Sequence, residues 1–466
     1  MRKFYYAVGV GLVGYLASVY TVDKFDQQLA VTRYHEIAKQ DISPLSTAAF
    51  DVLNKNGCSY CHTSDSEMPF YGNLPVAKQL MDKDVEDGTR HFYVDAMLNQ
   101  VRAGELVSEV DLAKLESVLE DNSMPPALYL TMHWRSKLSQ EETETLQAWV
   151  KQERLRHHTE QQNITAEFKY EAVQPIRTTF DVETAKVELG DKLYHDTRLS
   201  GDNTVSCASC HGLDTGGVDR LVTSVGVGGA IGPINAPTVF NSVFNTHQFW
   251  DGRAHDLQAQ AGGPPLNPLE MASDSWEQII EKLEVDDEMN AAFAAIYAEG
   301  ITEHSITDAI AEFEKTLVTP NSRFDQFLRG NYDALSAEEQ EGYALFKEHK
   351  CSTCHVGEAM GGQSFEVMGL KHDYFASRGG ELTEADYGRF NETGDDRDLH
   401  RFKVPTLRNV ALTAPYFHDG SVETLADAVD KMAYYQVGVK LSEAEIGKIT
   451  AYLETLNGEY NGQILQ

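Results

Sequence analysis

Three stretches of the chain share one pattern of polar and apolar positions at the start of a predicted helix. The stretches begin at Leu138, Leu335 and Leu441, and in each a serine is followed three residues later by glutamate. Serine and glutamate at this spacing form a capping box, in which each side chain bonds the backbone amide of the other residue. Apolar residues then recur at helical spacing, as at Leu146 and Val150. The pattern predicts amphipathic helices, and long strands are not evident.

The N-terminus holds a long uncharged run. Two basic residues precede an uncharged run from Phe4 to Tyr20, and Asp23 follows soon after. This length is at the short end for a membrane span and exceeds most signal-peptide cores. Because no clear cleavage site follows, residues 1–22 are interpreted as an uncleaved anchor, with a removed signal peptide as the alternative. We expect one span in the cytoplasmic (inner) membrane and the remaining domains in the periplasm.

Polar and loop-forming segments divide the rest of the chain. A polar segment with weak periodicity runs from residue 157 to 174, and a second junction lies around residues 319–331. Long loops rich in Gly and Pro, such as 212–232 and 262–268, separate the helices. The predicted domains are 23–160, 161–325 and 326–466.

Composition narrows the class of partner. The chain has 466 residues, with 39 basic and 72 acidic side chains and a formal net charge of −33. Nucleic acid is excluded as an expected partner, because binding phosphates needs basic patches. A neutral or cationic partner suits this surface better.

All six cysteines fall in three Cys-x-x-Cys-His motifs, the attachment pattern of c-type haem. Cysteines three apart share one face of a helical turn, and the histidine after them can offer a ring nitrogen to the iron. Zinc would need paired clusters at closer range, and disulfides would not explain the histidines. The motifs predict three covalently bound haem c groups. They consist of Cys58, Cys61 and His62; Cys207, Cys210 and His211; and Cys351, Cys354 and His355.

One motif falls in each predicted domain. The predicted fold is therefore mainly α, with three cytochrome c-type haem domains, long Gly- and Pro-rich loops and an N-terminal membrane anchor helix.

Six segments between Cys207 and the C-terminus carry a likeness to a known family: 207–211, 232–238, 249–253, 263–271, 351–355 and 407–420. Through them the sequence resembles the bacterial di-haem cytochrome c peroxidases. The likeness implies that the haem on His211 is the peroxidatic one and that the haem on His355 feeds it electrons. The N-terminal extension with its own haem looks like the tri-haem, quinol-oxidising branch.

The resemblance implies catalytic roles for three side chains. Glu270 matches the carboxylate that moves protons while the O–O bond breaks. It lies between Leu269 and Met271, a setting that could desolvate it and raise its pKa. Gln260 matches the amide that orients peroxide, and Trp250 matches the indole between the two haems.

The resemblance also implies a metal site and an axial ligand. Asn235, with the backbone carbonyls of Thr413 and Pro415, matches the calcium site of the family, whose hard oxygen ligands come from both haem domains. Met432 matches the sixth ligand of the haem on His355, and a Met/His pair raises the haem potential.

One position departs from the family pattern. Many of these peroxidases carry a distal histidine sixteen residues after the haem-binding histidine of the peroxidatic site, and Val227 stands there in this chain. Valine cannot ligate iron. The hypothesis is that the peroxidatic site is open or water-occupied in the resting enzyme and needs no reductive activation.

The N-terminal haem has His62 as its proximal ligand and several candidates for the opposite side. Met124, followed by two prolines, resembles the Met-Pro loop of small His/Met cytochromes, where proline stiffens the chain. Met124 is favoured and Met132 is second. The other candidates are His133, Met97 and Met68.

The expected function is a membrane-anchored tri-haem peroxidase that turns hydrogen peroxide, two electrons and two protons into two waters. The donor is quinol, inferred from the anchor, or a small cytochrome c, and a homodimer is compatible with the sequence. One alternative is the related di-haem oxidase that matures a tryptophan-derived quinone cofactor, whose second-haem ligand is tyrosine where Met432 stands here. The other is a non-catalytic multihaem electron carrier.

Overall fold

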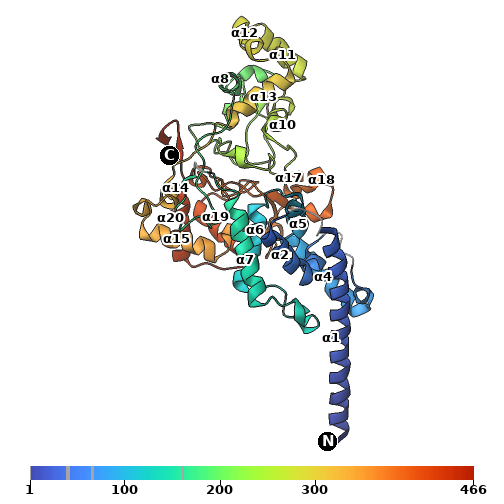
Figure 1. The fold of residues 1–466 in the computed structure, drawn as a ribbon. Helices are drawn as coiled ribbons and strands as arrows, with labels where there is room; N and C mark the ends of the chain where they lie inside the picture. Colours follow the sequence, from blue (N-terminus) through green and yellow to red (C-terminus); the bar gives the residue numbers. More distant parts are fainter. Residues whose placement is uncertain (1, 38–41, 64–67, 160–161) are drawn as a thin grey trace. The chain divides into compact units, whose positions relative to one another are not determined.

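The computed structural model describes residues 2–37, 42–63, 68–159 and 162–466 (Figure 1). Helices make up most of the regular structure, and the described strands are two or three residues long. The prediction of a mainly helical fold is confirmed. The chain divides into two compact units, Met1–His158 and Thr159–Gln466. The finer division at residues 161, 325 and 326 stays a prediction.

The first unit is a group of helices around one core. Helices α2, α5, α6 and α7 enclose the buried side chains of Met97, Leu112 and Trp149. The indole of Trp149 donates to the hydroxyl of Ser46 at 3.3 Å, so its one polar atom is paired. The helices are α1 (Arg2–Ile37), α2 (Pro44–Lys55), α3 (Cys58–His62), α4 (Pro75–His91), α5 (Val94–Ala103), α6 (Glu109–Asp121) and α7 (Gln140–Leu155).

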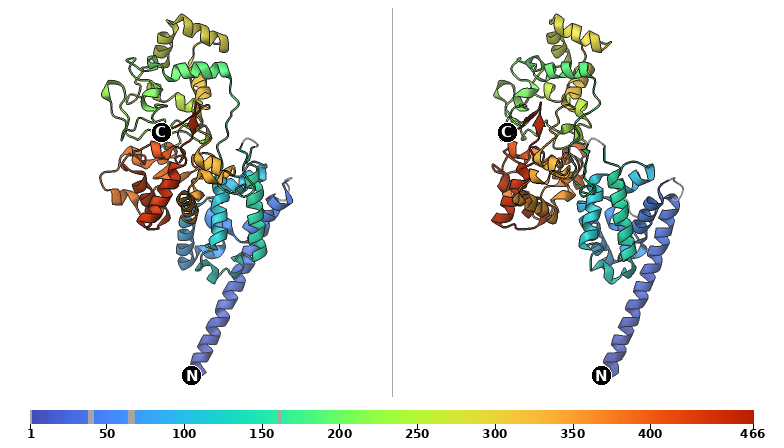
Figure 2. Two further views of the ribbon diagram at one scale, coloured as in Figure 1. Left: turned by 90° about the vertical axis from the view of Figure 1, so that its left-hand side faces the viewer. Right: turned by 60° about the vertical axis from the view of Figure 1, so that its left-hand side comes forward.

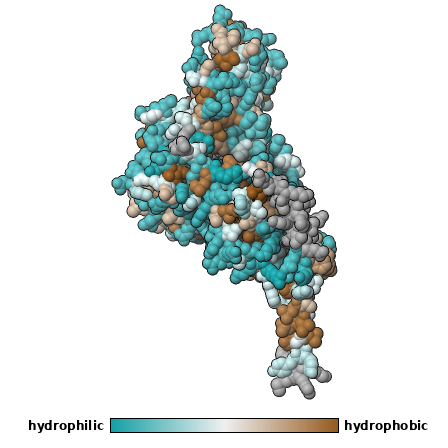
Figure 3. Space-filling view, viewed as in Figure 1, coloured by the Kyte–Doolittle hydropathy of each residue, from teal (hydrophilic) through white to brown (hydrophobic). Residues whose placement is uncertain are grey.

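Helix α1 runs far past the other helices of its unit (Figure 2). Polar and apolar contacts attach it to the unit. The Asp26 carboxylate accepts from the hydroxyl of Tyr71 at 2.7 Å and pairs with His133 Nδ1 at 2.8 Å. The ring of Phe25 packs on that of Phe70, with centroids 4.6 Å apart. These contacts lie in the C-terminal half of the helix. The N-terminal half exposes Val8, Val10 and other apolar side chains (Figure 3).

The expected membrane span is wrong. In residues 2–37 and the rest of the described chain, no helix combines the length and the apolar character needed to cross a bilayer. The uncharged run from Phe4 to Tyr20 contains three glycines and four tyrosines, which add little hydropathy. The predicted anchor at residues 1–22, and with it the single span in the inner membrane, is therefore not supported by α1.

The second unit begins with helices around its first haem motif. Helices α8 and α13 pack very closely: a Cβ on Gly190 would lie 1.9 Å from the carbonyl oxygen of Ala309. In Figure 1, α11 and α12 gather with this pair at one end of the unit. The helices are α8 (Thr184–Tyr194), α9 (Cys207–Cys210), α10 (Leu257–Ala261), α11 (Trp276–Glu284), α12 (Asp287–Ile296) and α13 (Glu303–Glu314).

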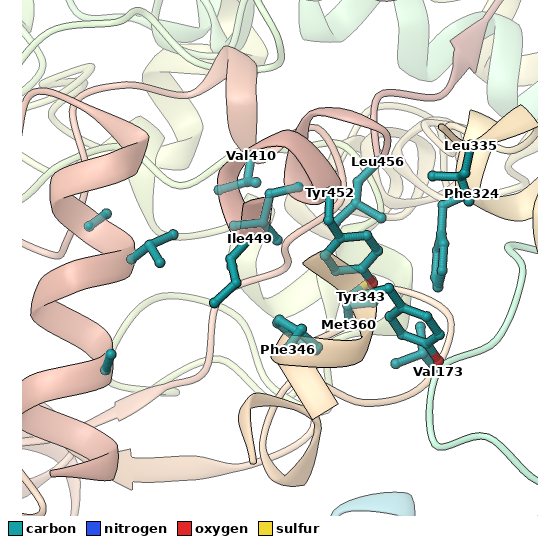
Figure 4. Packing of buried hydrophobic residues seen from close by; sticks show 14 of the residues in the cluster. Val173, Phe324, Leu335, Tyr343, Phe346, Met360, Val410, Ile449, Tyr452 and Leu456 are labelled. Atoms are coloured by element: carbon teal, nitrogen blue, oxygen red, sulfur yellow. The ribbon is translucent and has the colours of Figure 1, made fainter. Parts of the chain in front are cut away.

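The remainder of the second unit packs around aromatic rings. Tyr452 is fully buried, and its ring centroid lies 5.1 Å from those of Phe324 and Tyr343. Figure 4 shows its hydroxyl directed at the sulfur of Met360, 3.9 Å away. The helices are α14 (Arg323–Leu328), α15 (Ala337–Glu348), α16 (Tyr374–Arg378), α17 (Glu384–Tyr387), α18 (Phe390–Thr393), α19 (Leu425–Met432) and α20 (Glu443–Glu454).

The strands form two small antiparallel pairs. In the first, Phe365 of β1 (Phe365–Val367) faces Lys403 of β2 (Arg401–Lys403). In the second, β3 (Glu459–Tyr460) pairs with β4 (Gln463–Ile464).

The predicted helix starts are confirmed. Reciprocal capping boxes open α7, α15 and α20 through Ser139 with Glu142, Ser336 with Glu339, and Ser442 with Glu445. Each box satisfies two backbone amides that would otherwise lack partners at the helix end.

The close packing of α8 on α13 gives a stability test. Gly190→Ala should destabilise the protein by about 1–3 kcal/mol, because the added methyl group overpacks the interface. Gly447→Ala is the matched control: it also lies in a helix, α20, and its Cβ would meet nothing within 4 Å. That change should stabilise by about 0.4–1 kcal/mol. Thermal unfolding followed by circular dichroism measures both, and equal midpoints for the two variants would contradict the packing argument.

Candidate active site

Each Cys-x-x-Cys-His motif forms a short helical turn that presents its histidine in the same way. The Nδ1 atoms of His62, His211 and His355 lie 2.9, 3.3 and 3.0 Å from backbone carbonyl oxygens of Phe92, Gly217 and Met360. A backbone carbonyl on Nδ1 fixes the ring and leaves Nε2 free to bind a metal. Burial lowers the pKa of all three histidines, which keeps the imidazole in the neutral form that iron binds.

The cysteines are available for covalent attachment. All six lie in the described part of the chain, and none forms a disulfide. Burial raises the pKa of Cys58 to about 11 and the pKa of Cys61, Cys207 and Cys351 to about 12. Paired neutral thiols beside an oriented imidazole fit c-type haem at each motif.

Glu270 lies near the cysteines of the second motif. Burial raises its pKa, opposed by the positive charge of Arg253 and by a hydrogen bond that Asn267 Nδ2 donates at 2.8 Å. Its charge in turn adds to burial in raising the pKa of Cys207 and Cys210. The carboxyl group is therefore within electrostatic reach of both cysteines.

Val227 is fixed to Glu270 through the backbone. The Val227 amide donates to the Glu270 carbonyl at 2.8 Å. The preceding residue, Gly226, permits this approach, since a Cβ there would lie 2.2 Å from the carbonyl oxygen of Leu269 and 2.5 Å from that of Glu270. Val227, which stands where the family pattern has a histidine, therefore borders the loop that carries the Glu270 carboxylate.

Two further residues lie near the loop that carries Glu270. Gln260 comes from α10, and Arg253 comes from the segment before α10. Gln260 is half-buried in α10, and its backbone carbonyl accepts from the amide of Gly263 at 3.0 Å. The guanidinium of Arg253 lies 3.5 Å from the centre of the Phe249 ring and is bonded to Asp251.

Trp250 connects the two halves of the second unit. Its indole N–H donates to the backbone carbonyl of Asn235 at 2.9 Å, and its ring meets Phe402 and His418 edge-on at 6.4 and 6.5 Å. Its own carbonyl accepts from the amide of Lys403 at 2.8 Å. The indole is thus bonded on the side of the second motif and packed on the side of the third.

The residues of the predicted calcium site lie on neighbouring segments. The amide of Asn235 donates to the carbonyl of His418 at 2.8 Å, which places it beside the loop that includes Thr413 and Pro415. The Asn235 side chain donates through Nδ2 to the carbonyl of Leu221 at 2.9 Å, so its oxygen faces elsewhere. An amide oxygen and backbone carbonyls are ligands that fit Ca²⁺.

Met432 ends α19, and a π-helical turn from Ala433 to Val437 follows directly. Such turns are rare and are frequent at functional sites. Met432 is half-buried. Its role as an axial ligand stays a prediction.

Comparisons with known proteins agree with the motifs along the chain. Three family models match: haem-binding domain over residues 15–152, di-haem cytochrome c peroxidase over residues 184–333, and cytochrome c over residues 339–457. The chain is 53% identical over 435 residues to the cytochrome c peroxidase Ccp of Escherichia coli (strain K12), covering 92% of each chain. It belongs to the di-haem cytochrome c peroxidase family.

Two further matches support this membership. The cytochrome c551 peroxidase of Nitrosomonas europaea is 45% identical over 291 residues, covering 62% of this chain and 85% of the relative. The crystal structure of a MauG-like protein associated with microbial copper homeostasis is 28% identical, with a TM-score of 0.54, over 59% of this chain and 90% of that one. The chain is therefore a haem c oxidoreductase of the peroxidase class.

The axial ligand of the N-terminal haem of this family member is not decided by the fold. Met124 is 40% exposed, Met132 is half-buried and Met97 is fully buried in the helical core. His133 stacks on Tyr129 at 3.9 Å and pairs with Asp26. Met68 lies beside Gly72. The preference for Met124 stays a prediction.

Sequence reasoning missed two groups near the site. Asn267, which bonds Glu270, stands three residues before it, a spacing that could have been recognised. The second group surrounds His418, whose Nε2 lies 2.9 Å from Asp386, and Arg378 bridges Asp386 and Asp419. No local sequence signal joins residues so far apart. Arg378 balances one of the two carboxylate charges, and His418 bonds Asp386, so the group forms an ion network.

The Gly226 contact gives a test of the pocket. Gly226→Ala should lower peroxide turnover by about 10- to 100-fold, because displacement of a catalytic loop by about 1 Å has effects of this size. Haem content should not change. Gly262→Ala is the control, since its Cβ would meet its neighbours at an ordinary 3.5 Å. Steady-state peroxide reduction by both purified variants checks this, and unchanged turnover in Gly226→Ala would contradict the close approach.

Proposed function

We propose that this chain reduces hydrogen peroxide to two waters with two protons and two electrons, and that a small cytochrome c supplies the electrons. The observation that supports the proposal is electrostatic: the charge of Glu270 contributes to the raised pKa of Cys207 and Cys210, and the Val227 amide is bonded to the Glu270 carbonyl. A carboxyl group that could transfer protons therefore lies near the second motif, and the Val227 side chain cannot bind iron.

Haem c would be held at three sites, by His62, His211 and His355 with the cysteine pairs before them. When bound, it supplies the redox chemistry and the site for peroxide. The equivalent placement of all three Nδ1 atoms supports three sites of the same kind. We infer three domains, 23–160, 161–325 and 326–466, with one site each.

Glu270 would move the protons. A carboxylate takes a proton from the peroxide oxygen nearer to it and returns it to the departing oxygen, which leaves as water. The hydrogen bond from Asn267 keeps one carboxylate oxygen in place and leaves the other free for peroxide. Gln260, in α10 of the same pocket, would orient peroxide through its amide.

Trp250 would shorten the electron path between the second and third motifs. Its ring is held at the nitrogen by Asn235 and packed against Phe402, so its position is fixed. Calcium bound by Asn235, Thr413 and Pro415 would hold the same two segments together with hard oxygen ligands.

Met432 and Met124 would complete the electron-transfer sites. A methionine ligand raises the potential of the haem on His355, as a donor to the peroxidatic site requires. Methionine at 432 also favours the peroxidase over the quinone-maturing oxidase, where tyrosine is expected. The quinol donor was inferred from the anchor, so without a spanning helix a small cytochrome c is preferred; an acidic surface of net charge −33 suits a basic cytochrome.

Glu270→Gln should reduce turnover by about 10²- to 10⁴-fold, which is the usual contribution of a general acid–base group to the rate. In the unmodified enzyme, burial raises the pKa of Glu270. The carboxylate is protonated as pH falls through this raised pKa, so activity should fall on the acidic side. The glutamine variant should lack this limb. Glu281→Gln, on the exposed surface of α11, is the control and should behave as the unmodified enzyme. A pH profile of kcat/KM measures both, and an unchanged acidic limb in Glu270→Gln would reject the role.

The fully oxidised enzyme should turn over peroxide without prior reduction, because Val227 leaves the site open. Val227→His should introduce a requirement for reductive activation, whereas Val285→His, at a residue 82% exposed, should not. Stopped-flow mixing of oxidised protein with peroxide, with a small cytochrome c and with a quinol as rival donors, tests the proposal. A strict need for pre-reduction in the unmodified enzyme would reject the open site, and faster turnover with quinol would reject the donor.

A further inference from the structure

Lys403 is a buried cation without an acidic partner. Four basic residues are buried in the described part of the chain, and three have a carboxylate within 4 Å: Arg154 with Glu109, Arg401 with Asp398, and Arg408 with Asp325. Lys403 is 5% exposed and forms no ion pair or side-chain hydrogen bond with any described residue. Its surroundings therefore lack the anion that the other three have.

An unpaired buried ammonium is costly. Charged groups in protein interiors are paired, bind a ligand or lose their charge. Burial alone lowers the pKa of Lys403, to about 8, so at pH 7 the side chain still carries its charge. A buried side chain that keeps its charge is stabilised by an anion beside it.

The position of Lys403 points to the third motif. Its backbone amide donates to the carbonyl of Trp250 at 2.8 Å. Two residues later, the backbone of Pro405 lies close enough to the His355 ring to oppose the fall in the His355 pKa caused by burial. Residues 403–405 therefore lead from the Trp250 backbone to the imidazole of the third motif.

In β2 the side chains of Lys403 and its neighbour Phe402 point to opposite faces, so Lys403 does not share the aromatic contacts of Phe402. Phe402 stacks on His418 at 4.3 Å and meets Trp250 edge-on. Successive side chains of a strand point to opposite faces, so Lys403 extends away from these rings. Across the strand pair it faces Phe365, which offers no charge.

We propose that Lys403 is the counter-ion of a propionate of the haem held by Cys351, Cys354 and His355. Thioether attachment uses the vinyl groups of a haem and leaves its two propionate carboxylates, so haem brings an anion to this site. Lys403 is then a positioning residue: it neutralises the carboxylate and raises the potential of that haem. The inference rests on the haem site assigned to the third motif in the proposed function.

The test is potentiometric titration of the haem-loaded full chain. Lys403→Met should shift the reduction equilibrium of one haem about tenfold toward the ferric form, which is ~59 mV for a one-electron couple. The potential of that haem should also become more dependent on pH, because an unpaired buried propionate takes up a proton more readily. Lys403→Arg keeps the charge and should stay within about threefold of the unmodified protein. Lys440→Met, at an exposed lysine of the same domain, is the matched control.

The affected haem is assigned with Met432→His, which should lower the potential of the haem on His355. If Lys403→Met does not accumulate as haem-loaded protein, Lys403→Gln is used, with a smaller shift in the same direction expected. The inference would be overturned if Lys403→Met, with full haem content, had the same potentials and pH dependence as Lys440→Met. The proposed function would then remain intact. A chain with no haem at Cys351 and Cys354 would instead overturn the proposed function.

Discussion

The second unit depends on a fully buried polar network that joins its two halves. The side chain of Asn409 donates to the Thr319 hydroxyl at 2.9 Å, and Asn241 donates to the same oxygen at 2.8 Å. The neighbouring Arg408 pairs with Asp325 at 2.9 Å, with both side chains fully buried. Removing one partner of such a pair costs about 3–5 kcal/mol, because the remaining charge stays buried. The network therefore fixes the halves in one arrangement.

That arrangement matters because the site is assembled from both halves. A series of backbone contacts runs from His418 to Asn235, from Asn235 to the indole of Trp250, and from the Trp250 carbonyl to Lys403. Each contact is 2.8 or 2.9 Å long. In the proposed function Trp250 shortens the electron path, and hydrogen bonds of this kind limit the movement of its ring. The buried network therefore contributes to function by fixing the positions of these residues, and it takes no part in the reaction.

The parts that could be predicted from sequence are those set by local chemistry. The capping serines, the histidine after each cysteine pair and the desolvated setting of Glu270 all follow from neighbouring residues. The structure has the three caps, and burial raises the pKa of Glu270. The predicted anchor was wrong because the run from Phe4 to Tyr20 is uncharged without being strongly apolar, since glycine and tyrosine contribute little hydropathy. Lys403 could not be recognised, since a lysine at the end of a short strand is usually solvated, and only the tertiary fold buries it.

Glu314 and Lys403 are both buried ionisable groups, but burial leaves them in different charge states. Burial raises the pKa of Glu314 to about 8 and lowers that of Lys403 to about 8. At pH 7 both groups therefore hold their proton, which makes the carboxyl group neutral and leaves the ammonium charged. Glu314 Oε2 is buried without a hydrogen-bond partner among the described residues. The free energy lost is smaller for a neutral acid than for a charged group. Lys403 keeps most of its charge at this pH, so an anion beside it would stabilise the charged form.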